Sequence, residues 1–250
     1  MEDVFDVPGV VTVVPARMGA RRLPGKVLLP LGDATVLGQV VRRIRASGLT
    51  GRVVVAIPEG DADKPLEEWC TANEIDCYIG SRDDVVGRVL AASLAFEAAF
   101  VVCCPANRPL LEPRMLWASA RYASDSGMDF VSVARLPQGA SADAMPIRTL
   151  HSAAKLPVGA GRRDDFNAAT GDNPEIFERA MLPPPPRFAR PDLRFTLETS
   201  DDYALLCRIY DHVPAAENGT ISLDDAIVYV DANPRLLLQG NHSHAIVRAA

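Results

Sequence analysis

The stretch VVTVVPARMGARRLPGK, residues 10–26, determines how the rest of this chain is interpreted. Its first five residues are apolar or β-branched and stop at Pro15, which predicts a short buried strand. The loop that follows carries four cations among glycines and a proline: Arg17, Arg21, Arg22 and Lys26. An open α/β sheet binds ligands at the carboxyl ends of its strands, and Arg and Lys pair well with phosphate oxygens. The loop therefore predicts an anion site, with a solvated basic turn as the competing interpretation.

The known phosphate-binding motifs are missing from this loop. It contains neither GxxxxGK[ST] nor GxGxxG, which argues against a P-loop or a Rossmann dinucleotide site. The chain as a whole carries a net charge of −6, so it lacks the basic excess that nonspecific nucleic-acid binding requires. A local cationic loop in an acidic chain therefore favours a small anionic ligand, and we expect no nucleic-acid partner.

Composition bounds the class of protein. At 250 residues with 48% hydrophobic content, the chain suits one α/β domain or two small ones with a substantial core. Its five cysteines form no CxxC pair and are odd in number, which argues against a disulfide framework or a zinc site. Cys103 and Cys104 lie in an apolar run and are predicted to be buried. With neither a signal peptide nor a membrane span evident, we expect a cytoplasmic protein without a membrane partner.

Strands and helices alternate along the first half of the chain. Strands are predicted at 10–14, 52–57, 76–79 and 100–104, and helices at 36–46, 63–74 and 85–96. In the helix at 36–46 we expect Arg42, Arg43 and Arg45 on the outer face. This alternation predicts an α/β fold built on a doubly wound, mostly parallel sheet.

The loop also resembles a known family. The residues PARMGARRLPGK (15–26) match A-R-M-x-S-x-R-L-P-G-K, which opens the cytidylyltransferase-like family of spore-coat polysaccharide biosynthesis, related to CMP-sialate and CMP-Kdo synthetases. Further matches are GSRDDVVGRV (80–89), RFTLETSDDYALL (194–206) and ISLDDAIVYVDANPRLL (221–237). The resemblance extends over about residues 8 to 238 and is weak between about 138 and 190.

The resemblance implies a nucleotide-diphospho-sugar-transferase-like fold and transfer of a cytidylyl group from CTP to a sugar acid. It also implies Mg²⁺, a homodimer and one domain over 1–250, in which residues 135–192 form an inserted acceptor and dimerisation lobe. Arg17, Arg22 and Lys26 would act on the phosphates. Nucleotide contacts would come from Ala16, Met18, Gly19, Gly25, Ser81, Asp83, Asp84, Arg88 and Asn107. From the residues alone, 81–84 could equally cap a helix and Arg88 could lie on the surface.

The metal and acceptor sides depart from the family pattern. Asn107 stands where the family has a metal-binding Asp, followed by Arg108, and Glu198 stands where it has a second Asp. The expected metal ligands are Glu198, Asp202 and Asn107, and the expected acceptor contacts are Arg108, Asp143 and Arg163. Ala20 replaces a family Ser beside the triphosphate. These departures leave open a second function, that of a catalytically silent homologue that binds a nucleotide or pairs with an active partner.

Overall fold

The computed structural model describes residues 7–156 and 166–238, and its centre is a seven-stranded sheet of order β5-β4-β1-β6-β8-β7-β9. The strands are β1 (Val10–Pro15), β4 (Arg52–Pro58), β5 (Asp76–Gly80), β6 (Phe100–Cys103), β7 (Phe130–Val133), β8 (Asp143–Pro146) and β9 (Arg179–Leu182). A two-stranded ribbon, β2 (Pro30–Leu31) with β3 (Ala34–Thr35), stands apart from the sheet. The helices are α1 (Val36–Arg45), α2 (Lys64–Ala72), α3 (Val85–Ala95), α4 (Pro113–Ser126), α5 (Ile147–Lys155), α6 (Phe166–Gly171), α7 (Ser200–His212), α8 (Leu223–Ala232) and α9 (Arg235–Leu238), with 3₁₀ turns η1 (Lys26–Leu28), η2 (Asp61–Asp63) and η3 (Pro186–Phe188).

The strand pairings confirm a mostly parallel α/β sheet. β1 pairs in parallel with β4 on one side and with β6 on the other, and β4 pairs in parallel with β5. β8 is the exception, since it runs antiparallel to both β6 and β7, while β7 and β9 are parallel again. Because β1 lies inside the sheet, both of its faces must be buried, which explains its run of valines.

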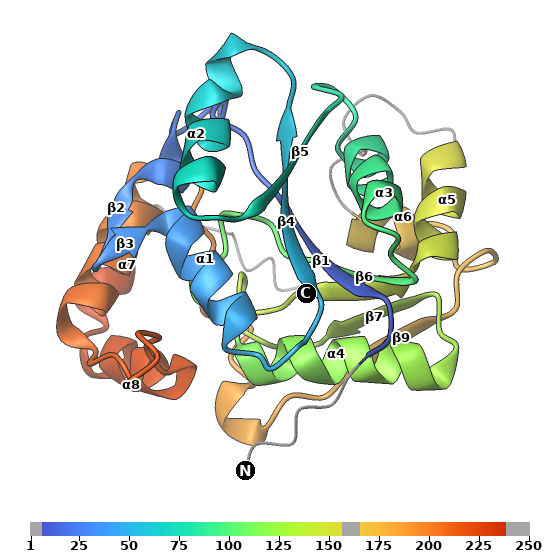
Figure 1. The fold of residues 1–250 in the computed structure, drawn as a ribbon. Coiled ribbons are helices and arrows are strands. Elements are labelled where there is room, and N and C mark those ends of the chain that lie inside the picture. Colours follow the sequence, from blue (N-terminus) through green and yellow to red (C-terminus); the bar gives the residue numbers. More distant parts are fainter. Residues whose placement is uncertain (1–6, 157–165, 239–250) are drawn as a thin grey trace, which may run out of the picture.

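Alternate residues of β1 supply two different cores. Val10 and Val14 pack with residues of α1, α2 and α4, whereas Val11 and Val13 pack with residues of α3 and α5. Figure 1 shows α1 and α2 on one side of the sheet and α3 and α5 on the other. The sheet is thus covered by helices on both faces, as the predicted alternation requires.

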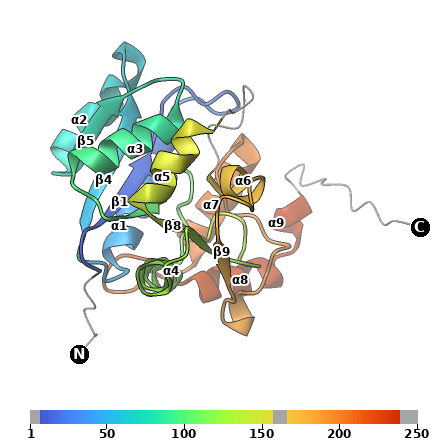
Figure 2. The same cartoon turned by 90° about the vertical axis from the view of Figure 1, so that its right-hand side faces the viewer.

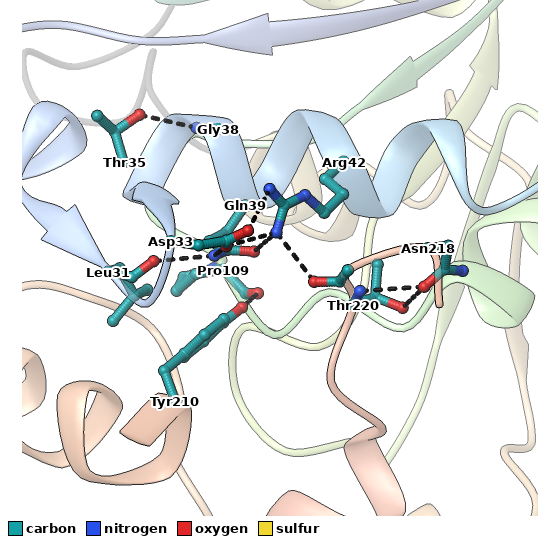
Figure 3. Close-up of polar contacts among 11 residues, drawn as sticks. Leu31, Asp33, Thr35, Gly38, Gln39, Arg42, Pro109, Tyr210, Asn218 and Thr220 are labelled. Carbon is teal, nitrogen blue, oxygen red and sulfur yellow. Dashed lines mark hydrogen bonds and ion pairs between the residues drawn. The ribbon is translucent and has the colours of Figure 1, made fainter. Parts of the chain in front are cut away.

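A third core joins the C-terminal helices to the rest of the chain. It contains buried residues of α7 and α8 together with residues 193–197 and Leu31 of β2. Figure 2 shows α7 and α8 grouped together, away from α3. Polar contacts hold this group to α1 and to the segment after β6 (Figure 3). Arg42 of α1 pairs with Asp33 at 2.7 Å and donates to the Gly219 carbonyl at 3.0 Å, and Tyr210 of α7 donates to the Pro109 carbonyl at 2.6 Å. The C-terminal segment is therefore anchored beside the sheet.

The described residues of the predicted lobe, 135–156 and 166–192, contribute strands to the main sheet. They supply β8 between β6 and β7 and the edge strand β9, and the helices α5 and α6 follow β8. The proline-rich stretch at 182–191 forms the short turn η3 and contributes no central strand, as its prolines predict.

One prediction for α1 was wrong. Arg43 does not lie on the outer face; it is 1% exposed and donates to the carbonyls of Leu111 at 2.9 Å and Ile221 at 2.6 Å. The guanidinium thus satisfies two buried carbonyl groups from distant segments. Cys103 and Cys104 are buried as predicted, and burial raises the pKa of the Cys104 thiol. None of the described helices combines the length and the apolar character that crossing a bilayer would demand.

Candidate functional site

A cleft of about 510 Å³ lies at the carboxyl ends of β1 and β6. Its walls come from the loop after β1, the segment after β6, the start of α3 and the segment before α7. Its lining residues are Pro15, Ala16, Arg17, Ala20, Arg21, Arg22, Lys26, Val27, Val85, Arg88, Pro105, Ala106, Asn107 and Glu198. This is the position at which an open α/β sheet holds its ligand.

The loop after β1 is folded around the backbone of Met18. The Met18 carbonyl accepts from the amides of Ala20 and Gly25, each at 2.9 Å. Gly25 has a φ of +72°, a conformation that favours glycine, and it immediately precedes the turn η1, whose first residue is Lys26. This turn brings Lys26 back towards the cleft, next to the arginines at its mouth.

The lining of the cleft is strongly cationic. It includes Arg17, Arg21, Arg22, Lys26 and Arg88, against the single carboxylate of Glu198. Arg17 and Arg21 are exposed, whereas Lys26 is 7% and Arg88 is 2% exposed. Five positive groups on one concave surface favour a polyanionic ligand such as an oligophosphate.

Side chains from three distant segments meet on the floor of the cleft. Lys26 Nζ donates to Glu198 Oε2 at 2.8 Å and to the Leu197 carbonyl at 2.7 Å. Asn107 Nδ2 donates to Glu198 Oε1 at 2.5 Å, and Arg22 Nη2 lies 3.6 Å from Glu198 Oε2. Both oxygens of the Glu198 carboxylate are thus held by nitrogen donors.

A second cavity of about 450 Å³ adjoins the first. The two share Pro15, Val85, Pro105, Asn107 and Glu198 as lining residues. The other polar side chains of the second cavity are Arg108, Ser132, Gln138, Ser141, Asp143, Asn167 and Thr196. Arg108 Nη1 donates to the Ser141 carbonyl at 2.7 Å, and Asp143 is 7% exposed. The neighbouring cavity therefore offers hydrogen-bonding groups of both charges.

Most predicted site residues meet at these two cavities. Ala16, Arg17, Arg22, Lys26, Arg88 and Asn107 line the first, and Arg108 and Asp143 line the second. Arg88 is not a surface residue; it is buried and donates to the Ser81 carbonyl. Sequence reasoning gave no site role to Val85, Gln138 or Thr196, because only the fold brings them to the cavities.

Other predicted nucleotide contacts shape the site from behind. Asp84 accepts from the Gly87 amide at 2.8 Å and Ser81 Oγ accepts from the Asp84 amide at 3.3 Å, so the predicted cap of α3 is confirmed and the nucleotide contacts stay predictions. Met18, Gly19, Gly25, Ser81, Asp83 and Asp84 are not among the residues that line either cavity. Arg163 lies outside the described residues.

Asp202, an expected metal ligand, makes hydrogen bonds and an ion pair within the protein. Its Oδ2 accepts from the amides of Glu198 and Thr199, each at 2.8 Å, and pairs with Arg194 at 3.2 Å. With Thr199 it forms the capping box of α7, and it is 5% exposed and lines neither cavity. Asp202 therefore fixes the backbone of Glu198 rather than facing a ligand.

The residues present fit a divalent ion only in part. Within 7–156 and 166–238, no three His, Cys, Asp or Glu residues gather closely enough to hold a metal ion. Glu198 and Asn107 do lie side by side at the junction of the two cavities. Mg²⁺ is commonly held by one or two carboxylates together with substrate phosphates, so these residues fit an ion that shares phosphate oxygens.

A doubly wound sheet with a cationic cleft at the carboxyl ends of its strands is typical of α/β proteins that bind nucleotides. The family comparison is more specific than the fold: the model of the cytidylyltransferase family matches residues 11–156, more than half of the chain. The chain belongs to the cytidylyltransferase family.

Relatives extend this similarity beyond the matched region. The spore coat polysaccharide biosynthesis protein SpsF of Bacillus subtilis is 25% identical over 230 residues, which is 90% of this chain and 95% of that protein. A 3-deoxy-manno-octulosonate cytidylyltransferase of Polynucleobacter necessarius is 29% identical over 136 residues, about half of each chain.

Solved structures share the fold. A cytidylyltransferase from Leptospira borgpetersenii has a TM-score of 0.83 at 24% identity and covers 94% of this chain and 99% of its own. The CMP:2-keto-3-deoxy-manno-octonic acid synthetase, solved with CTP, has a TM-score of 0.60 at 16% identity over 81% of this chain and 97% of its own. Rv0371c of Mycobacterium tuberculosis, solved with manganese, has a TM-score of 0.58 at 17% identity over 80% of this chain and 98% of its own.

Proposed function

We propose that this protein transfers the cytidylyl group of CTP to an anionic, hydroxyl-bearing metabolite such as a sugar acid and releases pyrophosphate. The observation that carries the proposal is the junction of the cationic cleft with the polar cavity at Asn107 and Glu198. A triphosphate in the first and an acceptor in the second would meet at this junction. The family supports CTP as the donor, and SpsF supports a place in surface-polysaccharide or related biosynthesis.

In this proposal the cations of the cleft bind the triphosphate. Arg17 and Arg21 are exposed at its mouth and would take the outer phosphates. Lys26 and Arg22, which pair with Glu198 in the free protein, would turn to the phosphate oxygens nearest the junction. Arg88 lies in the first turn of α3 and would help to form the pocket for the nucleoside. Fixed cations stabilise the charge that grows on a leaving pyrophosphate.

The chemical step is a displacement at the α-phosphorus. The acceptor hydroxyl oxygen forms the new bond to phosphorus and its proton passes to water, the bond from that phosphorus to the bridging oxygen of the β-phosphate breaks, and pyrophosphate leaves with the electron pair. The chain's contribution is to hold the acceptor oxygen in line with the leaving group. Arg108 and Asp143 would orient the acceptor from the second cavity, and Asn107 could donate to an α-phosphate oxygen.

Glu198 and the side-chain oxygen of Asn107 are the groups that would hold Mg²⁺ or a similar ion. When bound, such an ion would neutralise phosphate charge and orient the α-phosphate. The manganese in the structure of Rv0371c supports divalent metal use in this fold. We also propose that the protein is a homodimer in the cytoplasm.

The test is pyrophosphate release by the purified protein. CTP, UTP, ATP and GTP are each offered with a panel of acidic sugars and phosphonates, with Mg²⁺ or with EDTA. The proposal expects release with CTP and one class of acceptor. Calorimetric titration of each triphosphate provides a parallel measure that needs no acceptor.

One observation favours a second function, namely binding without turnover. Asn107 brings no charge where the family motif has Asp, and both oxygens of Glu198 are already held by Lys26 and Asn107. A silent homologue would bind CTP in the titration and release no pyrophosphate with any acceptor. An active enzyme would do both.

A further inference from the structure

Asp63 is a buried carboxylate that faces away from the helix it precedes. It ends η2 and occupies the N-cap position of α2, where an Asp side chain ordinarily accepts from the first turn. Here the side chain makes no capping hydrogen bond, although it is only 1% exposed. Its position in the chain therefore does not explain why a carboxylate is buried there.

The carboxylate reaches the loop that follows β1 instead. Asp63 Oδ1 accepts from the Met18 amide at 2.7 Å, across 45 positions of the chain. Met18 is the residue whose carbonyl closes the loop by accepting from Ala20 and Gly25. Its peptide unit follows Arg17, so the contact fixes the backbone between a cleft arginine and the turn that leads to Lys26.

The other oxygen faces a second loop. Asp63 Oδ2 lies 3.5 Å from Arg82 Nη2 and has no hydrogen bond among the described residues. The same Arg82 nitrogen donates to the Glu59 carbonyl at 2.6 Å, and a Cβ on Gly60 would collide with it. Arg82 adjoins Ser81, whose carbonyl accepts from the cleft residue Arg88.

We infer that Asp63 is a positioning residue that fixes the loop after β1 relative to the loop between β5 and α3, on the two sides of the cleft. A buried carboxylate with one hydrogen bond and one longer ion pair costs desolvation free energy, so it is weak as a stabilising device. Its geometry instead links Met18 to Arg82, and through them the cations on opposite sides of the cleft. The inference rests on the proposed function insofar as the ligand is CTP.

The experiment compares Asp63→Ala and Asp63→Asn with the exposed Asp61→Ala, which removes a surface pair with Lys64 in the same turn. Amide hydrogen exchange at Met18 is measured in the free protein, and CTP affinity is measured by calorimetry. We expect Asp63→Ala to lose protection at Met18 and to bind CTP at least about tenfold more weakly, the scale of a lost charge-assisted hydrogen bond. Asp63→Asn should keep the Met18 protection, because its oxygen still accepts, and should lose affinity less. Asp61→Ala should match wild type in both.

A folded Asp63→Ala protein with wild-type exchange at Met18, or with lost protection and wild-type CTP affinity, would overturn the inference. If Asp63→Ala does not fold, Asp63→Asn and Arg82→Met decide it: both must keep Met18 protected and weaken CTP binding. If wild type binds no CTP, the proposed function fails, whereas the exchange at Met18 still tests the link between Asp63 and the loop.

Discussion

Lys26 and Glu198, 172 positions apart in the chain, form an ion pair of 2.8 Å on the floor of the cleft. The lysine side chain is 9% and the glutamate side chain 28% exposed, so solvent screens the pair less than an ion pair on the surface. Lys26 also donates to the Leu197 carbonyl, which ties the loop after β1 to the segment before α7. A triphosphate that binds Lys26 would therefore break its ion pair with Glu198 and leave Oε2 of Glu198 without that donor.

Lys26→Met removes the charge and keeps much of the apolar stem. We expect CTP affinity to fall by about 1.5–3 kcal/mol, roughly 10- to 100-fold, because a charge-assisted phosphate contact is lost. Stability should also fall, by about 1–3 kcal/mol, since the Leu197 carbonyl and Glu198 lose a buried donor. Calorimetry and urea unfolding measure the two effects.

Lys64→Met is the matched control for Lys26→Met, because Lys64 pairs with Asp61 on the surface. It should change neither quantity appreciably. A folded Lys26→Met protein that binds CTP as well as wild type would show that the loop is a solvated basic turn.

Asn107→Asp places a second carboxylate beside Glu198, since Asn107 Nδ2 now lies 2.5 Å from Glu198 Oε1. Two adjacent carboxylates repel each other once both are ionised, and protonation of either one removes the repulsion. The cost in stability is therefore absent in acid and present once both groups are charged. In EDTA the variant should therefore lose thermal stability towards neutral pH, and Mg²⁺ should restore it.

Thermal unfolding of Asn107→Asp with EDTA and with Mg²⁺ measures this effect without an acceptor. Asn73→Asp, at an exposed position after α2, should show no Mg²⁺ dependence. If turnover exists, the Mg²⁺ concentration for half-maximal rate should also drop in Asn107→Asp. Equal unfolding curves with and without Mg²⁺ would argue that the junction does not hold an ion.

Local patterns were enough to predict the parallel strands β1, β4, β5 and β6 and the cationic loop, but they gave no signal for β7, β8 and β9. The valine run of β1 and the loop after it are contiguous, and parallel sheets place such loops at one edge. The ligand-facing roles of Arg17, Lys26 and Asn107 came from the family motif, and the fold brings all three to one cleft.

The wrong assignment of Arg43 came from giving its charge more weight than its place in the helical pattern. Arg43 lies seven positions after Val36, so helical periodicity placed it on the apolar face, but its charge suggested the surface. The contact between Asp63 and Met18 could not be predicted from the sequence, because the two residues belong to loops 45 positions apart.

Arg43→Met should destabilise the fold strongly. It removes the donors of two buried carbonyls: that of Leu111, between β6 and α4, and that of Ile221, just before α8. Each of the two buried carbonyls left unpaired costs about 1–3 kcal/mol, so we expect a loss of about 2–6 kcal/mol in the free energy of unfolding. Urea denaturation measures it, and the exposed Arg45→Met serves as the control, expected within about 0.5 kcal/mol of wild type. Similar values for both variants would mean that water replaces the guanidinium.

Arg108→Ala tests the division of labour between the two cavities. Arg108 lines only the second cavity and donates to the Ser141 carbonyl at 2.7 Å, whereas the phosphate-facing cations line the first. If Arg108 binds the acceptor, its removal should raise the acceptor KM by about 10- to 100-fold, the scale of one charged hydrogen bond, and leave CTP affinity within about twofold. Arg108→Lys should recover part of the loss, because it restores the charge without the planar fork.

Arg121→Ala, which breaks an exposed pair with Asp125 on α4, is the control for a lost surface charge. Steady-state kinetics with the acceptor found in the pyrophosphate screen, together with CTP calorimetry, give both numbers. An equal loss in CTP affinity would instead mean that Arg108 neutralises the triphosphate across the shared wall, as a substitute for the charge of a metal ion.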